Sequence, residues 1–150
     1  MKTLKNIRTT NRPLFLAIFL LRLALAATFL SAVFSRLGLW GSKSSGWEGF
    51  LEYTAQVNSF APAGMIPFLA VSATVLETTF GILLLIGYKV RYVAYGAAVL
   101  TLFFALAMGY SFGIKDPLDY SVFVDSAAAF LLANVASSGR WSADEYLNRK

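Results

Sequence analysis

Residues 14–35 read LFLAIFLLRLALAATFLSAVFS, and Arg22 is the only charged residue in this run. An α-helix needs about 20 mostly apolar residues to cross a hydrocarbon core of about 30 Å. Three further runs of similar character follow, at residues 61–88, 92–114 and 118–138. The four runs predict an all-α fold, a polytopic membrane four-helix bundle with antiparallel helices at about 13–37, 65–87, 91–113 and 118–138.

The composition is typical of a membrane protein and excludes several kinds of active site. The chain is 57% hydrophobic and only 14% charged, whereas soluble proteins carry about 25% charged residues. It contains no cysteine and no histidine, so the chain itself offers no thiol redox pair, no histidine-ligated haem and no Ser–His–Asp triad. We therefore expect no metal site and no cofactor held by the chain's own ligands.

The basic residues predict the orientation of the helices. The net charge of +5 does not indicate nucleic-acid binding, because the basic residues lie at the ends of the apolar runs. With the N-terminus inside, the cytoplasmic side holds most of the Lys and Arg residues, as the positive-inside rule requires. These are Lys2, Lys5, Arg8, Arg12, Lys89, Arg91, Arg140, Arg149 and Lys150, against Arg36, Lys43 and Lys115 outside.

We therefore expect three parts: a basic cytoplasmic N-terminus at 1–12, a transmembrane domain at 13–138 and a cytoplasmic tail at 139–150. The short links at 87–91 and 113–117 favour antiparallel packing of the helices that they join. A cleaved signal peptide is the competing interpretation of the start. Arg22 argues against it, because it would interrupt the apolar core of such a peptide.

The first connection, residues 38–64, is the only long one, and it predicts a short amphipathic helix in an outer loop. Apolar side chains recur at helical spacing from Trp47 to Phe60, while Glu48, Glu52 and Gln56 lie on another side. We expect this helix to lie on the outer membrane surface or to cap the bundle. A packed lid without a ligand and a substrate gate are both compatible with this pattern.

Four ionisable residues in or beside the apolar runs form the candidate site. A charge at the bilayer centre costs about 2.5–3.5 kcal/mol, so Glu77 should face the bundle interior and have a partner. Counted from the cytoplasmic helix ends, Arg22 and Glu77 differ in height by roughly 3 Å, which predicts that they pair. Asp125 lies nearer the outer side, where Arg36 could pair with it.

The sequence thus predicts a polar seam made of Arg22, Arg36, Glu77 and Asp125. Two interpretations remain open: ion pairs that fix helix register, or a ligand site or proton path. Small residues that recur every four positions on the helices predict close helix packing. They allow a homodimer as readily as a compact monomer.

Two stretches resemble the DoxX-like family of small four-helix membrane proteins. Residues 22–37, RLALAATFLSAVFSRL, are similar to its first helix, in which an Arg is followed by a Gly, a Phe and a small-residue stretch ending in Lys-Leu. Residues 77–91, ETTFGILLLIGYKVR, are similar to its second-helix pattern of Glu, Gly, a leucine run, Gly and Arg. Gly81, Gly87 and Arg91 fit this pattern, whereas Ala26 stands where Gly is usual.

The resemblance implies a multi-pass protein of the bacterial inner membrane, with both termini in the cytoplasm by the charge bias above. Members of the family have been linked to membrane oxidoreductase systems, including quinone-linked thiosulfate oxidation. The resemblance therefore implies an accessory or quinone-interacting subunit of a membrane oxidoreductase or envelope-stress system, more a non-catalytic subunit than an enzyme, with a redox protein as partner. The alternatives are a small-solute or proton carrier that uses the polar seam, and a structural assembly factor with no chemistry of its own.

Overall fold

The structure is a computed structural model that describes residues 12–136, 143 and 146. These residues form helices and turns, and none of those described lies in a strand. The elements in chain order are α1 (Arg12–Arg36), η1 (Gly41–Lys43), α2 (Gly46–Val57), η2 (Ala63–Met65), α3 (Ile66–Ile86), α4 (Val90–Phe112), α5 (Lys115–Asp119) and α6 (Val122–Val135). The predicted all-α fold is confirmed. The predicted cytoplasmic segments at 1–12 and 139–150 lie almost wholly outside the described residues.

Among the described residues, three helices are long and apolar enough to cross a membrane, namely Arg12–Arg36, Ala63–Ile86 and Val90–Phe112. The region of the fourth predicted helix, 118–138, differs from the prediction. It is divided into α5 and α6 by Ser121, which has a left-handed φ of 58°. α6 is apolar but has only 14 residues, fewer than the about 20 that usually cross a membrane.

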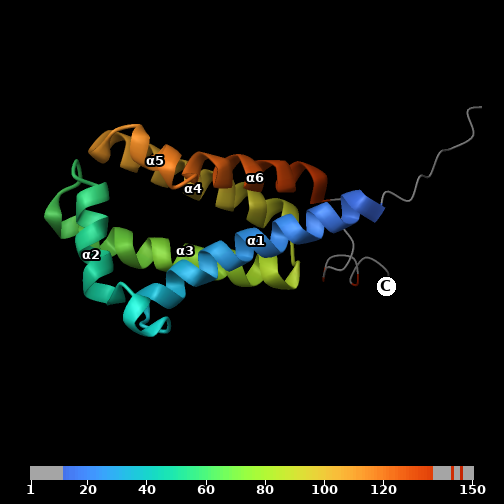
Figure 1. Ribbon diagram of the computed structural model, residues 1–150, viewed down its shortest axis with the longest axis horizontal. Coiled ribbons are helices and arrows are strands. Elements are labelled where there is room, and N and C mark those ends of the chain that lie inside the picture. Colours follow the sequence, from blue (N-terminus) through green and yellow to red (C-terminus); the bar gives the residue numbers. More distant parts are fainter. Residues whose placement is uncertain (1–11, 137–142, 144–145, 147–150) are drawn as a thin grey trace, which may run out of the picture.

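The turn between α3 and α4 is short because a glycine ends α3 in a tight conformation. Gly87 has φ 74°, and its N–H donates to the carbonyls of Leu83 at 3.0 Å and Leu84 at 3.2 Å. Glycine adopts this left-handed conformation at low cost, which is why it is common just after a helix. α4 then begins at Val90 and runs antiparallel to α3 (Figure 1).

The long helices are arranged as two pairs. α1 packs along α3, and α4 packs along α6, while the contacts between the two pairs are less extensive (Figure 1). The α4–α6 contact is built from small buried side chains, including Ala94, Ala97, Ala98, Ala129 and Ala133. Such residues allow helix backbones to approach closely inside a membrane.

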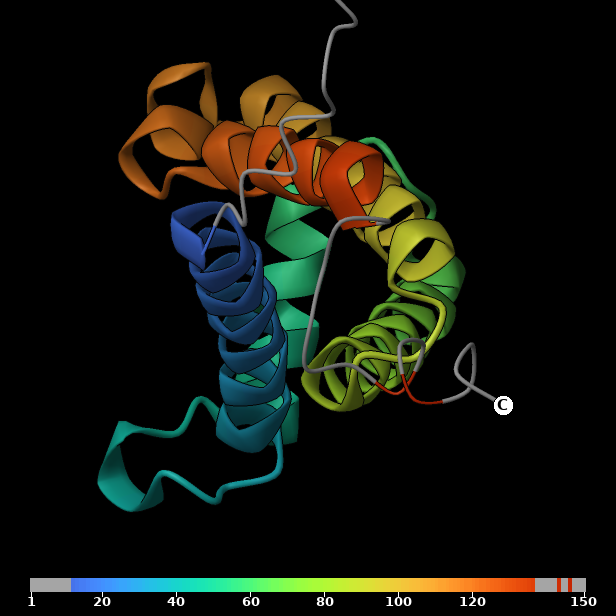
Figure 2. The same ribbon diagram turned by 90° about the vertical axis from the view of Figure 1, so that its right-hand side faces the viewer.

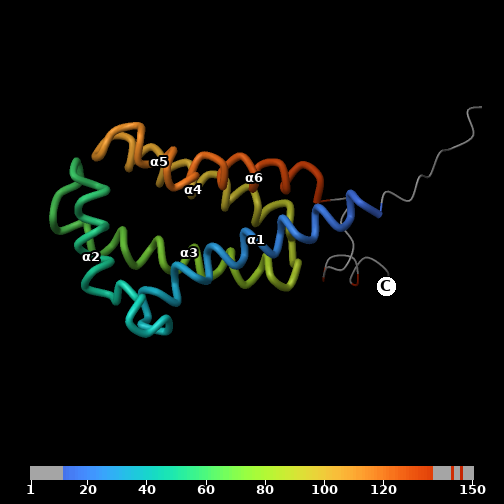
Figure 3. Tube along the Cα trace, in the orientation of Figure 1, coloured from blue at the N-terminus to red at the C-terminus, as the bar shows by residue number. Residues whose placement is uncertain are grey.

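The two pairs are close at the end where α3 turns into α4 and spread apart toward the other end (Figures 1 and 3). α2 crosses this wider end. Viewed along the long axis, α2 lies behind the space between α1 and the α4–α6 pair (Figure 2). The fold is therefore wedge-shaped, and the predicted loop helix stands at the open end of the wedge.

Candidate functional site

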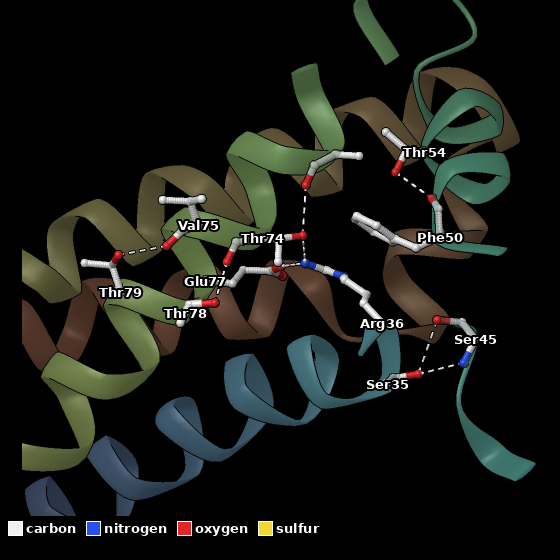
Figure 4. Close-up of polar contacts among 11 residues, drawn as sticks. Ser35, Arg36, Ser45, Phe50, Thr54, Thr74, Val75, Glu77, Thr78 and Thr79 are labelled. Carbon is white, nitrogen blue, oxygen red and sulfur yellow. Dashed lines mark hydrogen bonds and ion pairs between the residues drawn. The ribbon is translucent and has the colours of Figure 1, made fainter. Parts of the chain in front are cut away.

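The central polar contact of the molecule is an ion pair between Arg36, at the end of α1, and Glu77, in the middle of α3 (Figure 4). The two side chains are only 8% and 6% exposed. Arg36 Nη1 also donates to Thr74 Oγ1 at 3.0 Å, and the Thr74 hydroxyl donates to the Ala70 carbonyl at 2.9 Å. Desolvation of a buried pair is offset only when such additional hydrogen bonds are present, so Thr74 is part of the site.

α2 covers this ion pair with an aromatic ring. The ring centroid of Phe50 lies 3.7 Å from Cζ of Arg36 (Figure 4), within the range of a cation–π interaction. One turn along α2, the buried Thr54 donates its hydroxyl to the Phe50 carbonyl at 2.7 Å. α2 is thus in direct contact with the charged site.

Serine hydrogen bonds attach both ends of α2 to the long helices. At its start, the N–H of Ser45 donates to Ser35 Oγ of α1 at 3.0 Å (Figure 4). At its end, Ser111 Oγ of α4 donates to the Val57 carbonyl at 2.6 Å and lies 2.9 Å from Ser59 Oγ. α2 therefore bridges the two helix pairs.

We expect Ser111→Ala to loosen α2 without unfolding the protein. A hydrogen bond contributes about 0.5–1.5 kcal/mol, so amide hydrogen exchange in α2 should become about two- to tenfold faster. Mass-spectrometric exchange of the protein in detergent measures this directly. Thr79→Ala is the matched control, because exposed Thr79 donates only to the Val75 carbonyl of its own helix. Unchanged exchange in Ser111→Ala would contradict the bridging role of α2.

A cavity of about 940 Å³ lies between the helix pairs and beneath α2. Its wall is mostly apolar, as in most sites for small molecules. Polar side chains interrupt this wall, namely Thr28, Arg36, Tyr53, Thr54, Asn58, Ser72, Glu77, Thr101, Tyr110, Tyr120 and Asp125. The arrangement is suited to a ligand with a large apolar part and a small polar head.

The structure brings three of the four residues of the predicted polar seam to this cavity: Arg36, Glu77 and Asp125. Their pairing differs from the prediction. Glu77 pairs with Arg36 rather than Arg22, and Asp125 has no ion-pair partner within residues 12–136. Arg22 is buried nearer the N-terminal end of α1 and does not line the cavity.

The register of α1 against α3 explains why the predicted pairing was wrong. A Cβ at Gly81 would lie 2.8 Å from Leu30 Cγ, so Gly81 and Leu30 are at one level. Glu77 lies one turn from Gly81 toward the wide end of the wedge. Arg22 is eight residues from Leu30 in the opposite direction, about 12 Å along the helix. Depth counted from the helix ends is misleading because α1 begins beyond the α3–α4 turn (Figure 1).

The residues of the family pattern have distinct structural positions. Gly81 is buried where α1 approaches α3, Gly87 caps α3, and Arg91 is exposed in the first turn of α4. Sequence reasoning missed Thr74 and Phe50 as members of the site. Thr74 could have been found from its spacing, because residues three apart on a helix share a face.

These features describe a class of protein: a multi-pass membrane protein with a largely apolar cavity beside a buried ion pair. Within this class, the chain belongs to the DoxX family, whose model matches residues 17–109. The matched range includes Arg36 and Glu77 but ends before Asp125. No curated protein and no solved structure matches the chain.

Proposed function

We propose that this chain is a four-span inner-membrane subunit that binds a quinone-type molecule beneath α2 and serves a membrane oxidoreductase or an envelope-stress system. The observation that carries the proposal is the mostly apolar cavity of about 940 Å³ with the Arg36–Glu77 pair in its wall. A quinone combines an apolar tail with a ring whose two carbonyl oxygens accept hydrogen bonds. These properties match the apolar wall and the polar groups within it.

Donors for the quinone carbonyls are available on two sides of the cavity. Arg36 offers guanidinium N–H groups, and Tyr53 of α2 offers its phenol. Burial raises the pKa of the Tyr53 phenol above its ordinary value, and the nearby Tyr120 and Asp116 raise it further. The phenol therefore stays protonated, and remains a donor, throughout the neutral range. Phe50 and Phe104 supply ring faces against which a flat ligand can stack.

The proposed topology places α5 at the outer surface and uses α6 as the fourth span. Lys89 and Arg91 then lie on the cytoplasmic side, and Lys43 and Lys115 on the outer side, in agreement with the positive-inside rule. α2 would close the outer end of the cavity. A tail-bearing ligand would then enter from the lipid between the helix pairs.

An accessory role is favoured over a self-sufficient enzyme. The chain has no cysteine and no histidine, so it has no residue of its own that could form a redox disulfide or a histidine–haem ligand pair. Electrons would pass between the bound quinone and a partner protein that carries a redox group. The chain's contribution would be to bind and orient the quinone.

The proposal is tested by quinone binding to the purified protein. We expect saturable binding of a short-tailed ubiquinone by isothermal titration calorimetry, and at least about tenfold weaker binding to Ala73→Trp. Ala73 lines the cavity on α3, so an indole there would occupy ligand space. Val99→Trp is the matched control, because Val99 is exposed on α4 and does not line the cavity. Absence of saturable binding, or equal binding to Ala73→Trp, would rule out the proposed site.

A further inference from the structure

Asp125 has no role in the quinone proposal, yet it lines the same cavity. Its side chain is half-buried in the first turn of α6. The ion pairs within residues 12–136 are Arg36–Glu77 and Lys115–Asp119, so Asp125 has no cationic partner in that range. Arg36 and Glu77 neutralise each other. The cavity wall therefore carries one uncompensated negative charge.

Asp125 lies beside the N-terminus of α6. The N-terminus of a helix carries a partial positive charge that stabilises a carboxylate in the first turn, and Asp125 is the acidic residue of the first turn of α6. This interaction supports the charge without neutralising it. Asp116 of α5 adds negative potential nearby, since it contributes to the raised pKa of the Tyr53 phenol, which lines the cavity.

Aromatic rings make up much of the remaining wall. They come from α1, α2, the segment after α2, α4 and the link before α6, and include Phe29, Phe50, Tyr53, Phe60, Tyr110 and Tyr120. Phe60 and Tyr110 pack edge to face with ring centroids 5.3 Å apart, which holds both rings in place. The faces of aromatic rings attract organic cations, and more strongly where water is excluded.

We propose that this cavity binds a lipophilic organic cation, with the cationic centre near Asp125 and the apolar body among the aromatic rings. A positive ligand compensates the Asp125 charge in a mostly apolar space, where charge–charge attraction is stronger than in water. A neutral molecule leaves that charge uncompensated, and an anion adds repulsion. The inference rests on the charge and the rings of the cavity and does not depend on a quinone being bound there.

Two ions of the same shape and opposite charge test the inference. We expect the purified full chain, in an uncharged detergent, to bind tetraphenylphosphonium saturably and at least about tenfold more tightly than tetraphenylborate. Asp125→Asn is expected to weaken phosphonium binding about tenfold or more, whereas Asp125→Glu, which keeps the charge, should retain most of it. A tenfold change corresponds to about 1.4 kcal/mol. Equilibrium dialysis against each ion gives both affinities.

Asp119→Asn is the matched control. Asp119 is also a carboxylate on the α5–α6 segment, but it is 56% exposed, pairs with Lys115 and does not line the cavity. Equal binding of the two ions to the unaltered protein would overturn the inference. So would unchanged phosphonium binding in Asp125→Asn, or an equal loss in Asp119→Asn. Asp125→Glu keeps the negative charge. If it also lost phosphonium binding, the loss in Asp125→Asn would come from disturbed folding rather than from the missing charge.

The same variants separate this inference from the proposed function. Asp125→Asn is expected to keep its affinity for a short-tailed ubiquinone, because Arg36 and Tyr53 supply the donors to that ligand. Phosphonium binding without quinone binding would remove the proposed function and leave the cation site standing. Quinone binding without a preference for the phosphonium would remove the cation site and leave the proposed function standing.

Discussion

Glu77→Gln is expected to lower the free energy of unfolding by about 3–5 kcal/mol, the usual cost of removing one partner of a buried ion pair. The substitution leaves the Arg36 guanidinium enclosed by Thr74 and the Phe50 ring, with no carboxylate to balance its charge. At 8% exposure, the Arg36 side chain cannot regain solvent without moving α2. Unfolding of the detergent-solubilised protein by sodium dodecyl sulfate, followed by circular dichroism, measures the change.

Removal of both charges should restore most of the lost stability. Arg36→Met/Glu77→Met leaves no uncompensated charge, and replacing a buried pair by apolar residues of similar volume is often close to neutral. Glu52→Gln, at an exposed position of α2, is the single-charge control and should stay within about 0.5 kcal/mol of the unaltered protein. If Glu77→Gln were as stable as that control, the ion pair would not be enclosed as the structure has it.

Gly81→Ala is expected to cost about 1–3 kcal/mol, the usual penalty of overpacking a close contact. The added Cβ would lie 2.8 Å from Leu30 Cγ and 3.4 Å from Phe29 Cβ. Leu30 Cγ is in the middle of its side chain. The clash therefore cannot be relieved by rotating a terminal group alone, and α1 and α3 must move apart. The same unfolding titration measures the loss.

Leu30→Ala tests whether this contact is the cause. In the Gly81→Ala background it removes the clashing atoms, so the double variant should lose less stability than the sum of the two single changes. Gly109→Ala is the matched control on α4, because a Cβ there would meet only Pro117 Cγ at an ordinary 3.8 Å. A Gly81→Ala variant as stable as Gly109→Ala would show that α1 can shift at no cost.

The positions of the long helices could be predicted because the length of an apolar run is set by membrane thickness. The expected bounds were 13–37, 65–87 and 91–113. The corresponding helices in the structure are α1 (Arg12–Arg36), α3 (Ile66–Ile86) and α4 (Val90–Phe112). The break before α6 could not be predicted in this way. It depends on Ser121 in a left-handed conformation, and serine, unlike glycine or proline, is no strong signal of such a break.

Which residues line the candidate site was easier to predict than which of them form ion pairs. A membrane-buried carboxylate or guanidinium is costly enough that Arg36, Glu77 and Asp125 stood out in an apolar chain. Their partners depend on register, which the contact of Gly81 with Leu30 fixes. Helical periodicity says which face a residue occupies but not how far one helix slides along another, so the choice between Arg22 and Arg36 needed the three-dimensional structure.

In the proposed four-span topology, the break at Ser121 also shapes the bilayer around the protein. α4 has 23 residues and α6 has 14, which correspond to about 35 Å and 21 Å of helix. α5 carries Lys115, Asp116 and Asp119 and so belongs among the lipid headgroups. With α6 as the proposed fourth span, lipids beside its 14 described residues would thin to match it, while those beside α4 would not need to. Such thinning would bring headgroups and water toward Asp125, and the thickness of the host membrane would then set how readily a charged molecule reaches the cavity.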